Sequence, residues 1–345
     1  MGRKILWASL ALSPATFVAD LAFHLGHTPL FVLAAASLVP LAWLIGEATE
    51  HAAEHTGAGV GGFLNASFGN APELIIALLA VADGLPDVVR GSLTGSVVSN
   101  ILLVLGVALI AKGDGELDRT SLLRQLGLVV VAVLLFLVPA VPGFHGDPNR
   151  HSLAVLGIPL AIVLLAIYVY ATVRGLRRHR QIDSGSADSR GWSLKTSLVA
   201  LAVATAATAI VSEILVHTLQ SFADAAGFSD FFVATVIVAI VGNAAEHGGA
   251  VVIARRGNVK LASEIAISSS AQVALLVTGA VALLSFAVTP ALALSFRPVE
   301  LAAMGGAALF VGFVVLDGRS RRWEGFLLVA VYCAVAAGFW VAGDR

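Results

Sequence analysis

The chain has 345 residues, of which 58% are hydrophobic and only 12% are charged, and its mean hydropathy is +0.91. Soluble domains carry roughly 25% charged residues, so this chain has too few charges to cover the surface of a soluble protein of its length. The net charge of −1 gives no basis for nucleic-acid binding, and the single cysteine, Cys333, excludes an internal disulfide framework. The composition therefore predicts an all-α polytopic membrane protein embedded in a lipid bilayer.

A transmembrane helix needs roughly 20 predominantly apolar residues. The first such segment follows Arg3 and Lys4 and has no clear small-residue cleavage site, so we expect a retained helix rather than a signal peptide. Residues 174–194 are polar and basic, and they form the one long linker of the chain. Eleven transmembrane helices are expected, at residues 5–23, 29–46, 60–81, 88–111, 121–141, 152–173, 195–218, 230–254, 260–286, 297–316 and 323–342.

The basic residues predict how the chain is oriented. With the N-terminus inside, 17 of the 21 Lys and Arg residues lie in inner segments, and four lie outside. Because inner loops are enriched in basic residues, this bias favours a cytoplasmic N-terminus, an external C-terminus and an odd number of helices. We expect the protein in the inner (plasma) membrane of a prokaryote, with the 174–194 linker in the cytoplasm.

Two motifs in the sequence are copies of one pattern. Residues 69–73 read GNAPE and residues 242–246 read GNAAE, 173 positions later; at the same offset, GSVVSN at 95–100 is matched by SSSAQV at 268–273. A constant offset indicates duplication, and five helices per copy place the second copy upside down relative to the first, as in many secondary transporters. The predicted units are a first helix at 1–28, a repeat at 29–173, the linker at 174–194 and an inverted repeat at 195–345.

Each motif places a glutamate, Glu73 or Glu246, inside an apolar segment that contains no basic residue. A charge at the centre of a membrane helix costs about 2.5–3.5 kcal/mol on insertion scales, so such residues are usually functional. Asn70 and Asn243 lie three positions earlier, on the same helical face. Pro72 removes a backbone donor, so we expect a kink there that frees carbonyl oxygens. The two glutamates are therefore predicted to form one cation site at the midplane.

Neutral oxygens on the next helix of each repeat complete the predicted site. Calcium takes 6–8 oxygen ligands in flexible geometry, and no thiolate is near the motifs, so a calcium site is favoured over a soft-metal site. Each neutral residue taken singly is explained equally well by helix packing. The candidate supporting ligands are Asn70, Asn243, Ser96, Ser99, Asn100, Ser269 and Gln272.

A cluster of acidic residues and histidines follows the second predicted helix. Glu47, Glu50, His51, Glu54 and His55 share one helical face at its inner end. They are compatible with a solvated helix end, or with a cytoplasmic vestibule of Glu47, Glu50 and Glu54 that attracts cations. His51, Glu54 and His55 also fit the H-x-x-E-H pattern of zinc peptidases, but that interpretation lacks a third ligand and leaves the duplicated glutamates unexplained.

Five segments resemble the cation/proton exchangers of the calcium/cation antiporter superfamily, from about residue 40 to the C-terminus. They are GEATEHAAEH (46–55), GGFLNASFGNAPELIIALLA (61–80), GSLTGSVVSNILLVLG (91–106), VGNAAEHGGAVVIA (241–254) and EIAISSSAQVALLV (264–277). The resemblance implies an eleven-helix exchanger with two inverted repeats that exports calcium as protons enter. It places the calcium-binding glutamates at Glu73 and Glu246, with polar partners at Ser99, Asn100, Ser269 and Gln272.

The sequence departs from the family pattern at Ser268, where relatives usually have glycine, and in its basic linker, which is often acidic in relatives. Sodium-coupled members have an acidic residue near the position of Gln272, so its neutral side chain favours proton coupling. Competition of one Ca²⁺ with two protons for a shared pair of glutamates would give exchange, with Ca²⁺ as substrate and no cofactor. The alternatives are sodium coupling, another divalent cation such as Mn²⁺ or Cd²⁺, and an uncoupled cation channel. The sequence leaves the oligomeric state open.

Overall fold

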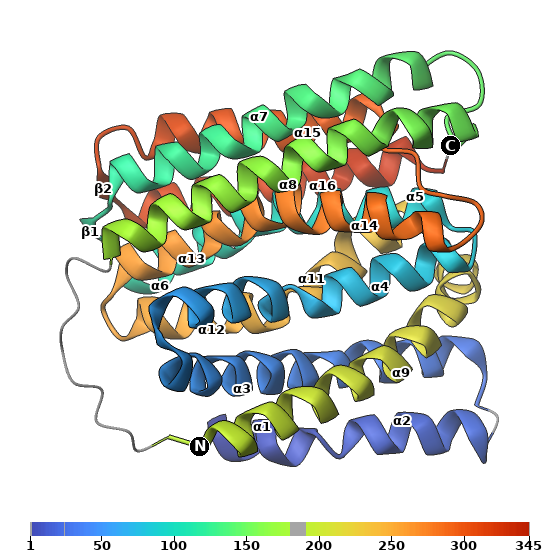
Figure 1. Ribbon diagram of the computed structural model, residues 1–345, viewed down its shortest axis with the longest axis horizontal. Helices are drawn as coiled ribbons and strands as arrows, with labels where there is room; N and C mark the ends of the chain where they lie inside the picture. Colours follow the sequence, from blue (N-terminus) through green and yellow to red (C-terminus); the bar gives the residue numbers. More distant parts are fainter. Residues whose placement is uncertain (1, 24, 180–190, 345) are drawn as a thin grey trace.

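The computed structural model is a bundle of long helices that run in nearly the same direction (Figure 1). It describes residues 2–23, 25–179 and 191–344. The helices are α1 (Gly2–Ser9), α2 (Leu12–Leu21), α3 (His27–Gly69), α4 (Ala71–Ala82), α5 (Pro86–Val98), α6 (Leu105–Lys112), α7 (Arg119–Gly143), α8 (His151–His179), α9 (Leu194–Ala226), α10 (Asp230–Phe232), α11 (Ala239–Gly242), α12 (Ala244–Arg255), α13 (Val259–Gln272), α14 (Thr278–Leu284), α15 (Pro298–Val314) and α16 (Arg322–Ala342).

Short irregular turns interrupt several of these helices without separating them. The π-helical turns are η1 (Ser99–Val104), η2 (Val233–Val238) and η3 (Val273–Val277), and η4 (Ser285–Ala287) is a 3-10 turn. The two strands, β1 (Gly115–Glu116) and β2 (Arg319–Ser320), pair antiparallel. The described chain is thus almost entirely helical, as the composition predicts.

Within the described residues, eight helical segments are long and apolar enough to cross a membrane. A further apolar pair, Asp230–Gly242 and Ala244–Arg255, is bent by 57° at its break. Because an apolar helix of this length satisfies its own backbone hydrogen bonds in lipid, these segments define an integral membrane protein. The prediction of a polytopic helical membrane protein is confirmed in this form.

The expected helices at 29–46 and 60–81 differ from the structure. α3 is helical without interruption from His27 to Gly69 and turns back on itself at one end of the bundle (Figure 1). A straight helix of this length would be about 65 Å long, twice the hydrocarbon thickness of a bilayer, so the chain has to turn. The glycine-rich stretch after Thr56 contains no proline that would break the backbone ladder. The true break comes later, at Asn70.

Local capping explains where several helices begin. Asp118, Ser193 and Asn258 accept hydrogen bonds from backbone amides at the starts of α7, α9 and α13. The bond from the Ser121 amide lowers the pKa of the exposed Asp118 carboxyl, and nearby Lys260 adds to this effect. Caps of this kind satisfy amides that the first helical turn leaves unpaired.

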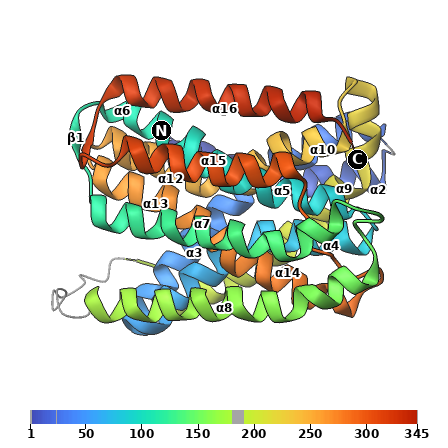
Figure 2. The ribbon, with the colours of Figure 1, turned by 90° about the horizontal axis from the view of Figure 1, so that it is seen from above.

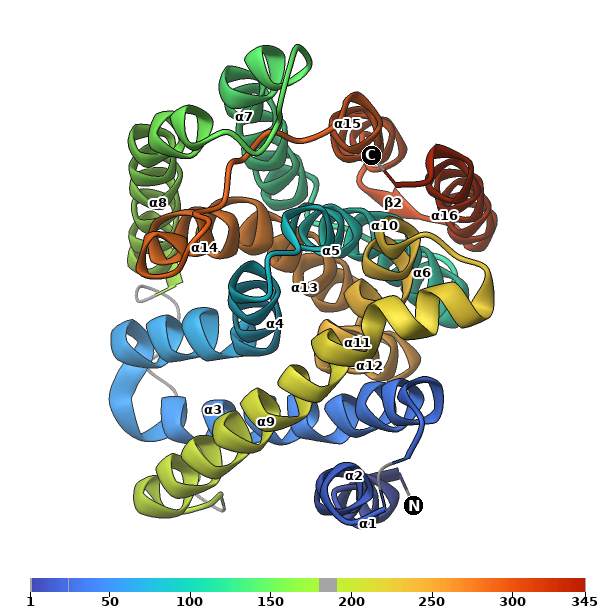
Figure 3. The same cartoon turned by 90° about the vertical axis from the view of Figure 1, so that its right-hand side faces the viewer.

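The helices form two groups (Figure 3). α3 and α9 cross over an extensive interface on one side of the molecule, with α1 and α2 beyond them. The remaining helices pack around α5 and α13, as the view from above also shows (Figure 2). Most buried side chains belong to one continuous core, but α3 and α9 also share a small separate apolar cluster around Leu44, Ala48 and Leu201.

Both ends of the bundle carry a contact between the two halves of the chain. At the end where α1 begins, Ser320 of β2 donates to the carbonyl of Gly113, which lies just before β1 (3.0 Å). At the opposite end, Ser295 donates to the Pro148 carbonyl, and the fully buried Arg90 donates to the Ala293 carbonyl (2.8 Å). In each case a connection or a helix of the first half is joined to a connection of the second. These contacts connect the two halves of the chain at both ends of the bundle.

Candidate cation site

Two helix breaks define the candidate site. α3 ends at Gly69 and α4 begins at Ala71, while α11 ends at Gly242 and α12 begins at Ala244. The residue between each pair, Asn70 or Asn243, leaves the helical conformation with nearly identical angles (φ −98°, ψ 17° and φ −90°, ψ 14°). The predicted kink at Pro72 therefore lies two residues earlier, and Pro72 occupies the first turn of α4, where its missing amide is tolerated.

Proline is not the general cause of these breaks, because the second motif has Ala245 in the place of Pro72 and is still interrupted. The common feature is a glycine that ends one helix and an asparagine that follows it. Glycine is a weak helix former, and asparagine competes for backbone hydrogen bonds. Pro72 predicts a break in the first motif only, whereas the Gly-Asn pair that both motifs share indicates a break in each.

Glu73 and Glu246 occupy the third position of α4 and α12. Helix N-termini present unpaired amides and a partial positive charge, which favour a carboxylate there. A Cβ atom built on Gly242 would lie 3.6 Å from Cγ of Glu73, and one built on Gly69 would lie 3.8 Å from Oε1 of Glu246. Each glutamate thus packs against the glycine of the other motif, so the two breaks face each other.

Hydrogen bonds cross between the repeats at this point. Asn70 donates through Nδ2 to Oε1 of Gln272 (2.8 Å). Asn243 donates to Oγ of Ser96 (2.7 Å) and accepts at Oδ1 from Asn100 (2.9 Å). Each break of one repeat is therefore bonded to the following helix of the other repeat.

Of the remaining predicted ligands, Ser269 joins this hydrogen-bond network, whereas Ser99 bonds within its own helix. Asn100 also lies 3.3 Å from Oγ of Ser269, which brings that residue into the network. Ser99 is buried, and its hydroxyl donates to the Ser96 carbonyl within its own helix (3.3 Å). The structure thus gathers the two glutamates and their neutral partners in one place, with Ser99 at its margin.

Several oxygens at this point are buried and make no hydrogen bond to any described residue. They are both carboxylate oxygens of Glu73, Oε2 of Glu246 and Oδ1 of Asn100. A buried polar atom without a partner is costly, and carboxylate and amide oxygens are the ligands that hard cations prefer. A cavity of about 10 Å³, close to the room that one water needs, adjoins Glu73, Ser92, Ser96 and Gly242.

The histidines near the end of the second predicted helix do not form a zinc site in the described part of the chain. His55 donates through Nε2 to the Trp192 carbonyl (2.7 Å), and His51 lies 3.7 Å from Glu47 and 3.3 Å from Glu54. Nowhere among the described residues do three or more His, Cys, Asp or Glu side chains gather as metal ligands. Glu50 is exposed on the same stretch of α3.

Sequence reasoning missed the π-helical turns. η1 begins at Ser99 and contains Asn100, and η3 begins at Val273 directly after Gln272. π-Turns insert one extra residue into a helix and often occur at functional sites. They have no clear sequence signature, so the repeat itself was the only available signal: the two turns occupy nearly equivalent positions of the two repeats.

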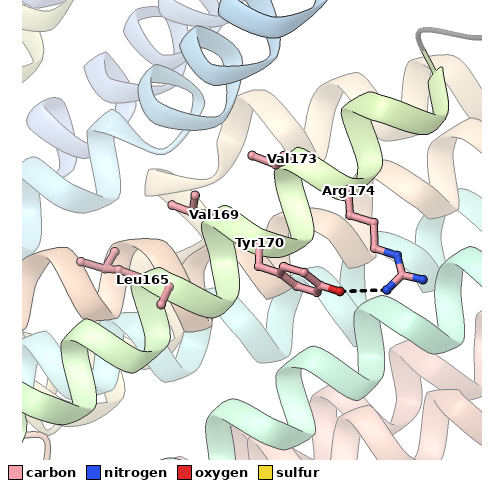
Figure 4. Close-up of a pocket in the computed structure, with 6 residues that line it drawn as sticks. Leu165, Val169, Tyr170, Val173 and Arg174 are labelled. Carbon is pink, nitrogen blue, oxygen red and sulfur yellow. Dashed lines mark hydrogen bonds between the residues drawn. The ribbon is translucent and has the colours of Figure 1, made fainter.

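A larger hollow of about 770 Å³ lies along α8, away from the helix breaks (Figure 4). Leu165, Val169 and Val173 line it, and Arg174 donates to the hydroxyl of Tyr170 (3.0 Å). It contains no carboxylate among its described lining residues, so its size does not make it a cation site.

Two broken helices that meet inside a polytopic helical bundle define a membrane transporter fold. A protein-family model described as sodium/calcium exchanger protein matches residues 27–174 and 196–341. The chain therefore belongs to the sodium/calcium exchanger protein family, a class of membrane transporters rather than enzymes.

Relatives and solved structures agree with this assignment. The chain is 35% identical to the Ca(2+)/H(+) antiporter ChaA of Bacillus subtilis (strain 168), over 98% of this chain and 99% of the relative. It is 32% identical to a Ca(2+)/H(+) antiporter of Aphanothece halophytica, over 92% and 91%. The structure of native YfkE matches with a TM-score of 0.84 at 33% identity, over 97% and 99%. The H+/Ca2+ exchanger CAX, at 19% identity and a TM-score of 0.71, shares the fold.

Proposed function

We propose that the protein is a secondary antiporter that exports Ca²⁺ from the cytoplasm in exchange for protons. The observation that carries this proposal is that Glu73 and Glu246 lie at two helix breaks that face each other. They come together with buried oxygens that have no hydrogen-bond partner among the described residues. The names of the relatives, which are Ca(2+)/H(+) antiporters, supply the ion pair. Ca²⁺ is the substrate here, and no cofactor is invoked.

The chemistry of exchange follows from the cost of two bare carboxylates in a buried place. One Ca²⁺ neutralises both, and so do two protons, but the ion and the protons cannot occupy the same oxygens together. Glu73 and Glu246 bind in both roles, while Asn70, Asn243, Ser96, Asn100, Ser269 and Gln272 supply neutral oxygens or hold the breaks in position. Ser99, three residues after Ser96, is a further candidate ligand.

We propose eleven membrane spans in two inverted five-helix repeats. Support comes from the eight long spans, the bent pair at Asn243, the 17-residue apolar helix Pro298–Val314, and the end of α3 taken with Ala71–Ala82. The family matches at 27–174 and 196–341 support repeats at 29–173 and 195–345, after a first helix at 1–28. The 174–194 linker separates them; its residues 180–190 lie outside the described part of the chain.

We also propose that the N-terminus and the 174–194 linker are cytoplasmic and that the C-terminus is external, in the inner membrane of a prokaryote. The two termini lie at opposite ends of the helices (Figure 1). Three of the basic residues at the proposed outer end, Arg90, Arg150 and Arg297, each donate to backbone carbonyls there. Their charges are used locally, so they do not oppose the positive-inside arrangement.

Proton coupling is proposed in preference to sodium coupling because Gln272 is neutral and accepts from Asn70. A sodium-coupled exchanger would be expected to have a further carboxylate at this position, and its negative charge would be balanced by the bound cation. The proposed vestibule of Glu47, Glu50 and Glu54 lies at the cytoplasmic end of α3, where it would raise the local concentration of cations.

The test is calcium uptake into proteoliposomes with an imposed pH gradient or an imposed sodium gradient. We expect the pH gradient to drive calcium uphill and the sodium gradient at fixed pH to drive none. Uphill transport with sodium alone would contradict proton coupling. Calcium flux that never exceeds its own gradient would indicate a channel, and stronger transport of Mn²⁺ or Cd²⁺ would change the assigned substrate.

A further inference from the structure

A cluster of aromatic and histidine side chains joins two helices and the segment before a third at the proposed cytoplasmic end. We call it the Trp192 clamp and define it as Trp7, Trp43, His51, His55 and Trp192. The Trp7 ring lies edge-on to Trp43 with centroids 5.5 Å apart and 6.0 Å from the Trp192 ring. These side chains come from α1, α3 and the residues just before α9, so the clamp connects three elements that are distant in sequence.

The segment before α9 is held tightly against α3. The Trp192 ring lies 5.1 Å from the His51 ring, and its carbonyl accepts from Nε2 of His55 (2.7 Å). A Cβ atom on Gly191 would lie only 2.6 Å from Nδ1 of His51 and 2.7 Å from Oε2 of Glu54. A larger residue there would displace the ends of these two side chains, so the backbone at Gly191 lies close against α3.

His51 is the group that makes this contact sensitive to pH. Glu47 and Glu54 flank it on α3 at 3.7 Å and 3.3 Å. Among the described residues, α1 and the segment before α9 bring uncharged groups to the clamp, namely Trp7, Gly191 and the Trp192 indole. A protonated imidazole donates from both ring nitrogens to the two carboxylates and places a positive charge beside the indole, whereas a neutral one donates from one nitrogen only and carries no charge.

Packed side chains connect the clamp to the cation site. Trp43, Trp192 and Phe68 all pack against the small apolar cluster that α3 and α9 share. Phe68 directly precedes Gly69, and Gly69 lies against Glu246. Any rearrangement of the break at Asn70 that moves Phe68 therefore disturbs the apolar cluster on which Trp43 and Trp192 of the clamp also pack.

We propose that the Trp192 clamp is a cytoplasmic pH brake: protonated His51 tightens it and slows transport, independently of proton competition at Glu73 and Glu246. The inference rests on the proposed function and adds a second, separate effect of protons. His51, His55 and Trp192 act here as positioning residues, because none of them lies at the cation site.

The first test is the maximal rate of calcium uptake in inverted vesicles, whose outer bath faces the cytoplasmic side. Calcium is saturating, and the pH difference across the membrane is held constant while both pH values change. We expect the wild-type rate to fall roughly 3- to 10-fold as the bath goes from pH 8 to pH 6. A change of this size is expected because it corresponds to the free energy of a few exposed charge contacts. His51→Gln should keep the high rate throughout, and Trp192→Phe should retain the brake more than Trp192→Ala does.

His217→Gln is the matched control, because His217 also pairs with a carboxylate, Asp83 (3.9 Å), but at the opposite end of the bundle. It should behave like wild type. The proposal is overturned if His51→Gln keeps the wild-type pH profile, or if it is slow at every pH. The first result would remove His51 from the brake, and the second would make it merely structural.

A second readout does not depend on transport. In a variant with Trp7, Trp43, Trp323 and Trp340 replaced by Phe, Trp192 is the only fluorophore of its kind. A protonated imidazole against the indole quenches its emission, so fluorescence should fall on acidification, and His51→Gln should abolish this change. Unchanged quenching in His51→Gln would overturn the clamp. If quenching behaves as expected while wild type fails to exchange Ca²⁺ for protons, the proposed function fails and the protonation of the clamp stands.

Discussion

The two helix breaks share a sequence pattern and a backbone conformation but differ in their surroundings. Asn243 is fully buried, accepts from Asn100 and donates to Ser96 and to the carbonyl of Ala239. Asn70 is bonded to Gln272 across the repeats. The second break follows a π-turn, η2, and bends its helix by 57°, whereas the backbone before the first is α-helical. The two repeats thus share the helix break but differ in the hydrogen bonds and the backbone around it.

The glutamates differ in the same way. Glu73 is 6% exposed and borders the small cavity with Ser92 and Ser96, whereas Glu246 is only partly buried. Residues after Glu246, such as Gly248 and Gly249, are exposed. The candidate site is therefore built from equivalent residues in non-equivalent environments, and Glu246 lies closer to the protein surface than Glu73. Substitutions at matched positions of the two repeats measure how far that difference matters.

The largest expected effect comes from removing either carboxylate. Glu73→Gln and Glu246→Gln should each lower gradient-driven calcium uptake by at least about 100-fold, since the amide keeps the shape and loses the charge that Ca²⁺ and protons both need. Uptake per folded protein in proteoliposomes measures this. Equal losses would show that the site needs both halves despite their different exposure; substantial transport by one variant would remove that glutamate from the site.

A second pair compares Gly95 with its repeat counterpart, Ser268. A Cβ atom on Gly95 would lie 1.9 Å from the Thr235 carbonyl oxygen, so α5 and η2 would have to separate. Ser268 is partly exposed, and its hydroxyl donates to the Ile265 carbonyl of its own helix (3.1 Å). Gly95→Ala should destabilise the protein by about 3 kcal/mol or more, and Ser268→Ala by less than about 1 kcal/mol.

The measurement is the thermal stability of each variant in detergent, followed by size-exclusion chromatography. A stable Gly95→Ala protein would mean that α5 and η2 do not approach as closely as the structure shows. The comparison also explains why the second repeat tolerates serine at 268, because it does not need that close approach.

A smaller difference is expected between the two asparagines. Asn243→Ala leaves Asn100 and Ser96 without their partner, and a buried polar group left unpaired costs about 1–3 kcal/mol. Asn70→Ala removes the bond to Gln272. Asn243→Ala should therefore lower stability more than Asn70→Ala does, as measured by thermal unfolding with and without calcium. The reverse order would show that the first break is the better anchored.

The smallest effect is expected at the proposed vestibule of Glu47, Glu50 and Glu54. Replacing all three by Gln should weaken apparent calcium affinity about 2- to 3-fold at low salt, leave the maximal rate at neutral pH nearly unchanged, and lose its effect as salt rises. Kinetics of calcium uptake at several ionic strengths test this. A collapse of the maximal rate at every ionic strength would place these residues in the transport mechanism, and no change would indicate a solvated helix end.

The sequence predicts which side chains come together better than it predicts the course of the backbone between them, and the binding of a cation by these side chains stays a prediction. The duplicated glutamates and most neutral partners were predicted because a charge in an apolar helix and a constant repeat offset are both visible in one dimension. The position of the first break was wrong by two residues, because Gly69 and Asn70 rather than Pro72 end the helix. The docking of Trp192 on His51 and His55 was not predictable, because it joins residues more than 130 positions apart and depends on how α3 and α9 cross.

The most direct test of a shared site is the release of protons when calcium binds. Purified protein in weakly buffered detergent solution should release protons on addition of Ca²⁺, and its apparent calcium affinity should weaken as pH falls, since protons occupy the same oxygens. Both effects should disappear in Glu73→Gln and in Glu246→Gln. Calcium binding that releases no protons and keeps the same affinity at every pH would contradict a site at which Ca²⁺ and protons replace each other.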